Sequence, residues 1–186
     1  MSPAARLLLP LLVLAAPAPL CAQTTRTTQV AERPATAEDQ RPNNPAVPDA
    51  YALTGRFDRI VVMRMKFRTD LLRGIEQLVR QEHIENGVIL SAIGSVRGYR
   101  IHQVASRDFP SRDQYVDRPT TPADLVAMNG YIVHGRVHAH VVLGSGASTV
   151  AGHLEPGTEV FTFAIVTVGV LPDDVDLSKL DQTSYR

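Results

Sequence analysis

Two histidines separated by a single residue give the clearest chemical signal in this sequence. His138 and His140 lie in the apolar segment 136–143, whose composition is that of a β-strand. Because successive side chains of a strand alternate between its two faces, both imidazoles point the same way. A third histidine, His153, follows a glycine-rich turn signal at 144–146. A hairpin at that turn would place all three imidazoles side by side.

Three imidazoles on one surface predict a metal site. Catalytic zinc sites use three protein ligands and leave a further position for water or substrate. Imidazole also suits copper, nickel and iron(II), so the ligands indicate a divalent transition metal, with Zn²⁺ as the first candidate. We therefore predict that His138, His140 and His153 bind the metal. The alternative is a set of strand-surface histidines that only form hydrogen bonds.

Two charged residues near these histidines are candidates for a catalytic role. Glu155 follows His153 closely and could act as a general acid or base, or be a solvated residue of the turn Glu155-Pro156-Gly157. Arg136 shares the strand parity of His138, so it could bind an anionic ligand beside the metal or be an exposed sheet residue. For the remaining histidines no metal role is predicted; these are His83, His102 and His134.

The hydrophobic pattern that must position these residues is mainly that of β-strands. Alternating or short apolar runs predict strands at 57–67, 88–93, 97–105, 125–133, 136–143, 149–154 and 159–170. Helical spacing of apolar residues predicts one helix, capped by Thr69 and ended at Asn86-Gly87. The prolines and charges of 107–122 predict a loop. The expected fold class is α+β, a mainly antiparallel sheet with one main helix packed on it.

The N-terminal residues predict export. Residues 1–22 have the layout of a cleaved signal peptide, with Arg6, an apolar run at 7–20 and a small residue, Ala22, at the cleavage position. A secreted or periplasmic location without stable membrane insertion follows. An uncleaved anchor, or a lipoprotein modified at Cys21, is the alternative. We expect a disordered linker at 23–53, the domain at 54–171 and a polar tail at 172–186.

The overall composition argues against a nucleic-acid partner. Lys and Arg total 19 and Asp and Glu total 19, so the chain lacks the basic excess that binds phosphates. Tryptophan is absent and aromatic residues make up 5%, which leaves few side chains for base stacking. Cys21 is the only cysteine, so cleavage after Ala22 would leave no thiolate ligand or nucleophile.

Four short motifs resemble, in order and spacing, the plant-and-prokaryote-conserved (PPC) domain family. They are VILSAIGS (88–95), MNG (128–130), HAHV (138–141) and GHLEPG (152–157). The resemblance covers about residues 57–171. It implies a compact α+β domain that assembles as a homotrimer and carries the His-x-His and Gly-His motifs as a metal site. The implied fold is similar to that of acetolactate decarboxylase, a zinc enzyme.

The sequence departs from the family pattern in ways that bear on function. Ala164 stands where members often have a glutamate, Ala151 replaces a glycine, and the AT-hook of plant members is not found. Three functions remain open. They are metal-dependent chemistry on a small carbonyl or carboxylate compound, a non-catalytic homotrimeric ligand-binding module, and the DNA binding that the family label suggests.

Overall fold

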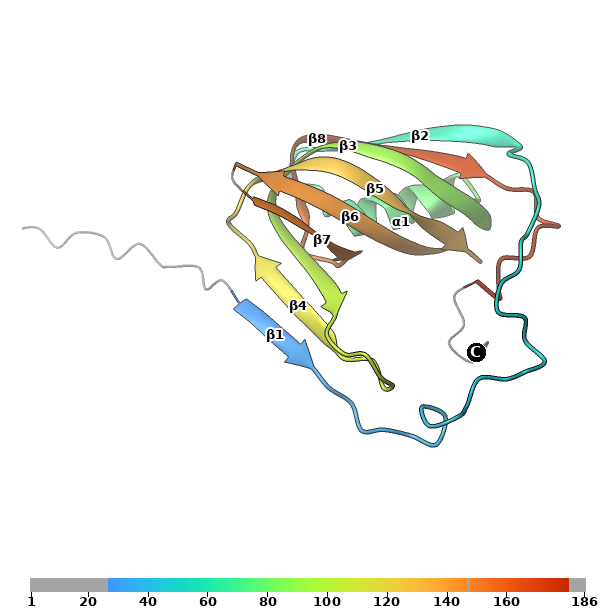
Figure 1. Ribbon diagram of the computed structural model, residues 1–186. Coiled ribbons are helices and arrows are strands. Elements are labelled where there is room, and N and C mark those ends of the chain that lie inside the picture. The colour runs from blue at the N-terminus through green and yellow to red at the C-terminus, as the bar shows by residue number, and fades with distance from the viewer. Residues whose placement is uncertain (1–26, 147, 181–186) are drawn as a thin grey trace, which may run out of the picture.

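In the described part of the chain, the sheet is antiparallel at every pairing and carries one helix, which confirms the predicted α+β class (Figure 1). The computed structural model describes residues 27–146 and 148–180. Their elements are β1 (Thr27–Ala31), β2 (Arg59–Lys66), α1 (Leu71–Gln81), β3 (Asn86–Val104), β4 (Asp113–Arg118), β5 (Ala123–Val133), β6 (Arg136–Ser145), β7 (Ser148–Leu154) and β8 (Glu159–Val170).

The long strand β3 organises the sheet. Its first part pairs with β5 and β8, and its last part pairs with β4 and β7. Since β5 pairs with β6 and β6 with β7, the strands β3, β5, β6 and β7 form a closed ring of pairings. The buried apolar side chains of this ring form most of the core, together with those of β2, β8 and α1.

The prediction of two strands at 88–93 and 97–105 was wrong, because β3 runs through Gly94 without interruption. The register shifts on both sides of this region, so the strand bends rather than ends. A side chain at Gly94 would place its Cβ 2.2 Å from the carbonyl oxygen of Phe163 on β8. Gly94 therefore allows close backbone approach in a bulged strand. In a sequence, a glycine in this role cannot be told from a glycine that forms a turn.

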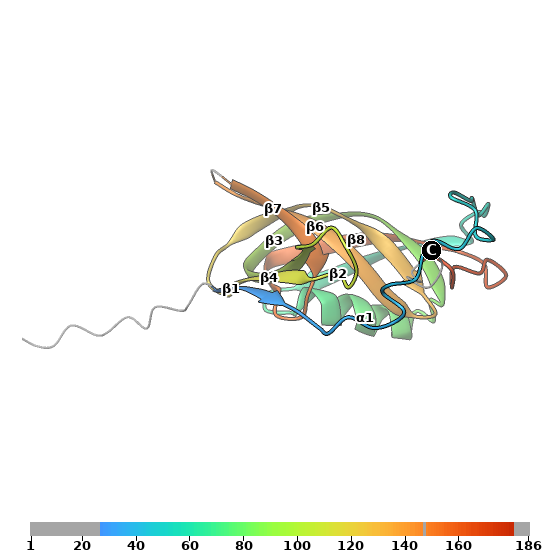
Figure 2. The ribbon, with the colours of Figure 1, turned by 60° about the horizontal axis from the view of Figure 1, so that its bottom comes forward.

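The helix α1 packs its apolar residues against one side of the sheet (Figure 2). Its buried side chains include Leu71, Ile75 and Val79. Asp70, rather than the predicted Thr69, caps the helix, because its Oδ1 accepts a hydrogen bond from the backbone N–H of Arg73 at 3.0 Å. Asp70 has the extended backbone conformation of an N-cap residue, with φ −65° and ψ 122°, and Thr69 lies one residue outside the cap.

Two strands occur where the sequence predicts no regular structure. β1 lies within the expected linker and β4 within the expected loop, and the two strands pair with each other. All five residues of β1 are exposed, so backbone hydrogen bonds at a sheet edge hold it in place. A strand without a buried face needs no alternating apolar residues, so the sequence of β1 gives no sign that it pairs with a sheet edge. The predicted signal peptide lies outside the described residues.

The segments before β2 and after β8 pack against each other. Leu177 is buried, and the hydroxyl of Tyr51 donates a hydrogen bond to the carbonyl oxygen of Lys179 at 3.1 Å. The chain from 172 to 180 therefore lies back against the domain. No helix in the described part of the chain is both long and apolar enough to cross a membrane.

Candidate metal centre

The three predicted ligands come together on the outer side of the strand ring. On β6, Ala139 and Val141 are buried in the core, so His138 and His140 point outward. The turn after β6 leads directly into β7, and His153 pairs with His140 in the register of these two strands. The structure thus has the shared face and the hairpin that the sequence predicts.

The ring nitrogens of these histidines are close enough to share one ion. One ligand atom from each of His138, His140 and His153 lies within 4.8 Å of the others. The Nε2 atoms of His138 and His140 are 3.2 Å apart. Two nitrogens at zinc-ligand distance in a tetrahedral site lie about 3.3 Å apart, so this pair needs almost no movement to bind a metal. The described residues therefore fit a transition metal by donor type and by spacing.

The electrostatics keep two of these imidazoles neutral. Burial, followed by the neighbouring histidines, lowers the pKa of His153 to about 4. Burial, followed by the nearby His138 and His102, also lowers the pKa of His140. A neutral imidazole has the lone pair that a metal requires, so His140 and His153 do not have to lose a proton at neutral pH.

His102 also belongs to this cluster, although no metal role was predicted for it. It pairs with His153 in the register of β3 and β7, and the two rings stack with centroids 4.5 Å apart. Its Nδ1 lies 2.7 Å from Oε1 of Glu155. His102, His153 and Glu155 form a second group whose ligand atoms lie within 4.8 Å of one another.

Glu155 is therefore held in the cluster and is not merely a solvated turn residue. Both Glu155 and His102 have side chains only 20% exposed. A carboxylate bonded to Nδ1 of a histidine favours the tautomer whose Nε2 is unprotonated. The contact depends on the continuation of β3 past Gly94, so sequence periodicity gave no sign of it.

Gly152 permits this close pairing. A Cβ at this position would lie 2.5 Å from the carbonyl oxygen of His102 and 3.2 Å from Cδ1 of Ile101. Only a residue without a side chain lets β7 approach β3 so closely beside the histidines.

His138 contributes to the lining of two hollows of different character. The larger, of about 570 Å³, is lined by His138, His140 and mostly apolar residues. The smaller, of about 250 Å³, is lined by His138 and His153 together with Arg136, His134 and Ser178. Arg136 thus lines a hollow beside the histidine cluster but does not line the larger one.

Comparisons with known proteins find sequence relatives that match part of this chain. The chain is 27% identical over 119 residues to the bifunctional protein GlmU of Synechococcus sp. (strain JA-3-3Ab), a match that covers 63% of this chain. The matched segment spans only 18% of that relative's length.

Two solved structures are similar in fold. A metal-containing protein from Archaeoglobus fulgidus has a TM-score of 0.55 and 25% identity, covering 66% of this chain and 86% of that one. A plant- and prokaryote-conserved protein from Pyrococcus horikoshii has a TM-score of 0.56 and 22% identity, covering 67% and 87%. The model of the Plants and Prokaryotes Conserved (PCC) domain matches residues 52–172. The chain therefore belongs to this family, as the motifs at 88–95, 128–130, 138–141 and 152–157 predict.

Proposed function

We propose that this protein binds a divalent transition metal, with zinc as the first candidate, and uses it to act on a small carbonyl or carboxylate compound. The observation that carries the proposal is the convergence of ring nitrogens from His138, His140 and His153 within 4.8 Å. The similar fold of a metal-containing archaeal protein supports it.

The ligand set favours Lewis-acid chemistry. A bound zinc ion supplies a positive charge that polarises a carbonyl or activates water. Three neutral imidazoles leave the full charge of the ion in place, whereas thiolate or carboxylate ligands would reduce it. Each of the three histidines therefore binds the ion without weakening its effect on a ligand.

The residues around the histidines have separate tasks in this proposal. Glu155 accepts a hydrogen bond at Oε1 from Nδ1 of His102, so this pair can hold or move a proton beside His153. Arg136 lines the smaller hollow and can orient an anionic group of the ligand. Together they provide an acid–base pair and a cation around one centre.

The variant Glu155→Gln tests whether the centre is catalytic. The zinc-loaded protein is incubated with a panel of small carbonyl and carboxylate compounds, and their conversion is followed by proton NMR. Glu155→Gln should retain one ion per chain at saturating zinc but lose roughly 10²- to 10⁴-fold in turnover, the usual contribution of a general acid or base.

Glu159→Gln is the matched control for Glu155→Gln. Glu159 begins β8 and pairs with Arg68 and Arg97 instead of with a histidine. It should keep both the metal and the turnover. Metal uptake by the wild type without conversion of any compound would contradict the enzymatic part of the proposal and favour a non-catalytic binding module.

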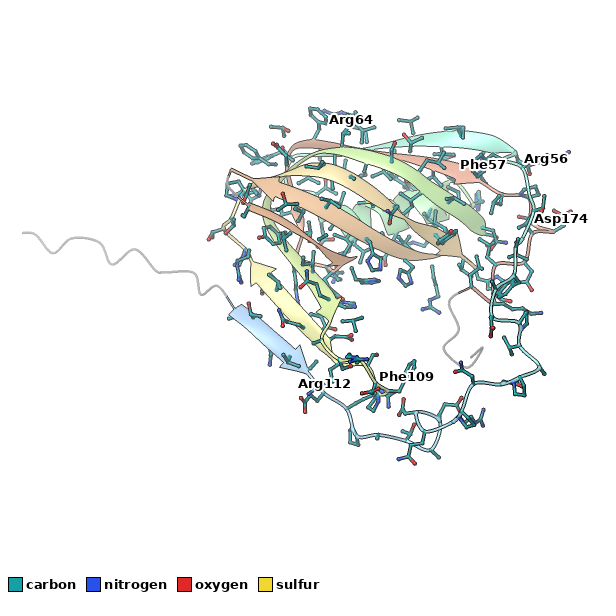
Figure 3. The ribbon with its side chains drawn as sticks, in the orientation of Figure 1. Arg56, Phe57, Arg64, Phe109, Arg112 and Asp174 are labelled. Carbon is teal, nitrogen blue, oxygen red and sulfur yellow. The ribbon has the colours of Figure 1, made fainter. Side chains whose placement is uncertain are left out.

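We further propose that the chain assembles with copies of itself, as the homotrimer that the family resemblance implies. The outer face of β2, β8 and β3 exposes a row of large apolar side chains that includes Ile60, Val62, Ile93 and Phe163. Arg64 projects from the same face, with its guanidinium 5.8 Å from the ring centre of Phe163 (Figure 3). An exposed apolar surface of this kind is typical of a protein–protein contact.

Val62→Asp should disrupt this assembly. Val62 is 65% exposed at the middle of the apolar face, so a carboxylate there would have to lose its hydration in the contact. Light scattering should give a trimer mass for the wild type and about one third of it for the variant. Val104→Asp, at a similarly exposed valine that ends β3, should remain trimeric. A monomeric wild type would contradict the proposal.

A further inference from the structure

The larger hollow beside the histidines is lined mainly by apolar side chains, and Asn129 is the uncharged polar residue among them. His138 and His140 form one wall, and Val88, Tyr131, Val133 and Leu180 contribute apolar surface. The hollow of about 570 Å³ is within the usual range for small-molecule sites. A ligand that fills it must therefore bury an apolar body while one end reaches the histidines.

The charged side chains near the histidines limit where the ligand can carry a charged group. No Lys, Arg, Asp or Glu is among the described residues that line the larger hollow. The cation Arg136 lines the smaller hollow and not the larger one. A charged group placed deep in the larger hollow would lose hydration and gain no oppositely charged side chain from the described lining residues, which is unfavourable.

The metal centre itself favours an anionic oxygen. With three neutral ligands, the ion keeps its full positive charge, and a carboxylate is the common anionic oxygen ligand for such an ion. The ligand then has one negative group, at the metal, and an uncharged body in the hollow. A monocarboxylate with an aliphatic body meets both conditions.

The C-terminal segment supplies the far part of this hollow. Leu180 lines it while remaining 43% exposed, so its side chain can contact a ligand. Buried Leu177 and the hydrogen bond from Tyr51 to Lys179 hold the segment against the domain. Leu180 is thus held at a position where only a ligand with a sufficiently long body can contact it.

We propose, building on the metal-dependent function above, that the site takes a small aliphatic monocarboxylate. Its carboxylate binds the ion at His138 and His140, its body fills the larger hollow, and Leu180 determines the preferred chain length. The apolar lining next to metal-ligand nitrogens carries this inference.

Titration of the cobalt-loaded full chain with carboxylates tests the proposal. The visible absorption of bound Co²⁺ reports first on metal uptake and then on each added carboxylate. From acetate to butanoate to hexanoate, the affinity should rise about fourfold for each methylene buried, the effect of its transfer from water. Adipate, which has a carboxylate in place of the terminal methyl group of hexanoate, should bind more weakly than hexanoate because no cationic side chain lines the described part of the hollow.

Paired variants separate the role of Leu180 from general effects on the fold. Leu180→Ala should weaken hexanoate about three- to tenfold and leave acetate unchanged, since only the longer body reaches residue 180. Leu53→Ala is the control, because Leu53 is similarly exposed, at 47%, but does not line this hollow. It should leave both affinities unchanged.

The possible results distinguish this inference from the proposed function. Failure of the protein to take up cobalt or zinc would overturn both. Uptake of the metal with equal affinities for acetate, hexanoate and adipate would overturn the inference alone. A rise in affinity with chain length that Leu180→Ala leaves intact would contradict the role of Leu180.

Discussion

Substitution of any one of the three histidines by alanine is expected to remove the metal at physiological zinc concentrations. We expect His138→Ala, His140→Ala and His153→Ala each to weaken zinc binding by more than about 100-fold, since the loss of only an outer hydrogen-bond partner of a ligand costs 10- to 100-fold. Elemental analysis after dialysis should find about one ion per chain in the wild type and a small fraction of that in each variant.

A histidine outside the cluster provides the control for these variants. His83 lies just after α1 with a φ of 51°, a left-handed conformation that asparagine tolerates well. His83→Asn should therefore preserve both the fold and the metal content. Equal metal content in His153→Ala and the wild type would contradict the assignment of His153 as a ligand.

Gly152→Ala is expected to disturb the centre without changing any ligand. Its Cβ would lie 2.5 Å from the backbone oxygen of His102, which cannot move aside as a flexible side chain could. Separation of β7 from β3 should cost about 1–3 kcal/mol in the free energy of unfolding. For a chain of this size, the Tm falls by roughly 2–4 °C per kcal/mol. Zinc affinity should fall as well, because His153 moves with β7.

Gly144→Ala is the matched control on the neighbouring strand. At this position the added Cβ would meet only a side-chain methyl of Val126, at 3.3 Å. Thermal unfolding and zinc titration should therefore give nearly wild-type values. If Gly152→Ala were as stable and as tightly zinc-binding as Gly144→Ala, the close pairing of β7 with β3 would not be needed to form the centre.

The histidine cluster could be predicted from local sequence because its geometry depends on short-range rules. Strand alternation placed His138 and His140 on one face, and a glycine-rich turn brought His153 next to them. Both inferences needed only neighbouring residues. The α+β class followed in the same way from the alternating apolar pattern and one amphipathic helix.

His102 and β1 could not be predicted because their positions depend on long-range pairing. His102 reaches the cluster only because β3 bends through Gly94 and pairs with β7, whereas a glycine in an apolar run equally indicates a strand end. Similarly, β1 has no buried residue to give a pattern. Leu180 reaches the larger hollow through packing of a segment whose sequence only indicates polarity.

Anomalous diffraction at the zinc absorption edge, on crystals of the full chain grown with zinc, tests the central claim most directly. The proposed function predicts one strong peak about 2.0–2.1 Å from a ring nitrogen of each of His138, His140 and His153. A crystal with no peak at these histidines, or with a peak bound by His102 and Glu155 but not by His138 and His140, would contradict it.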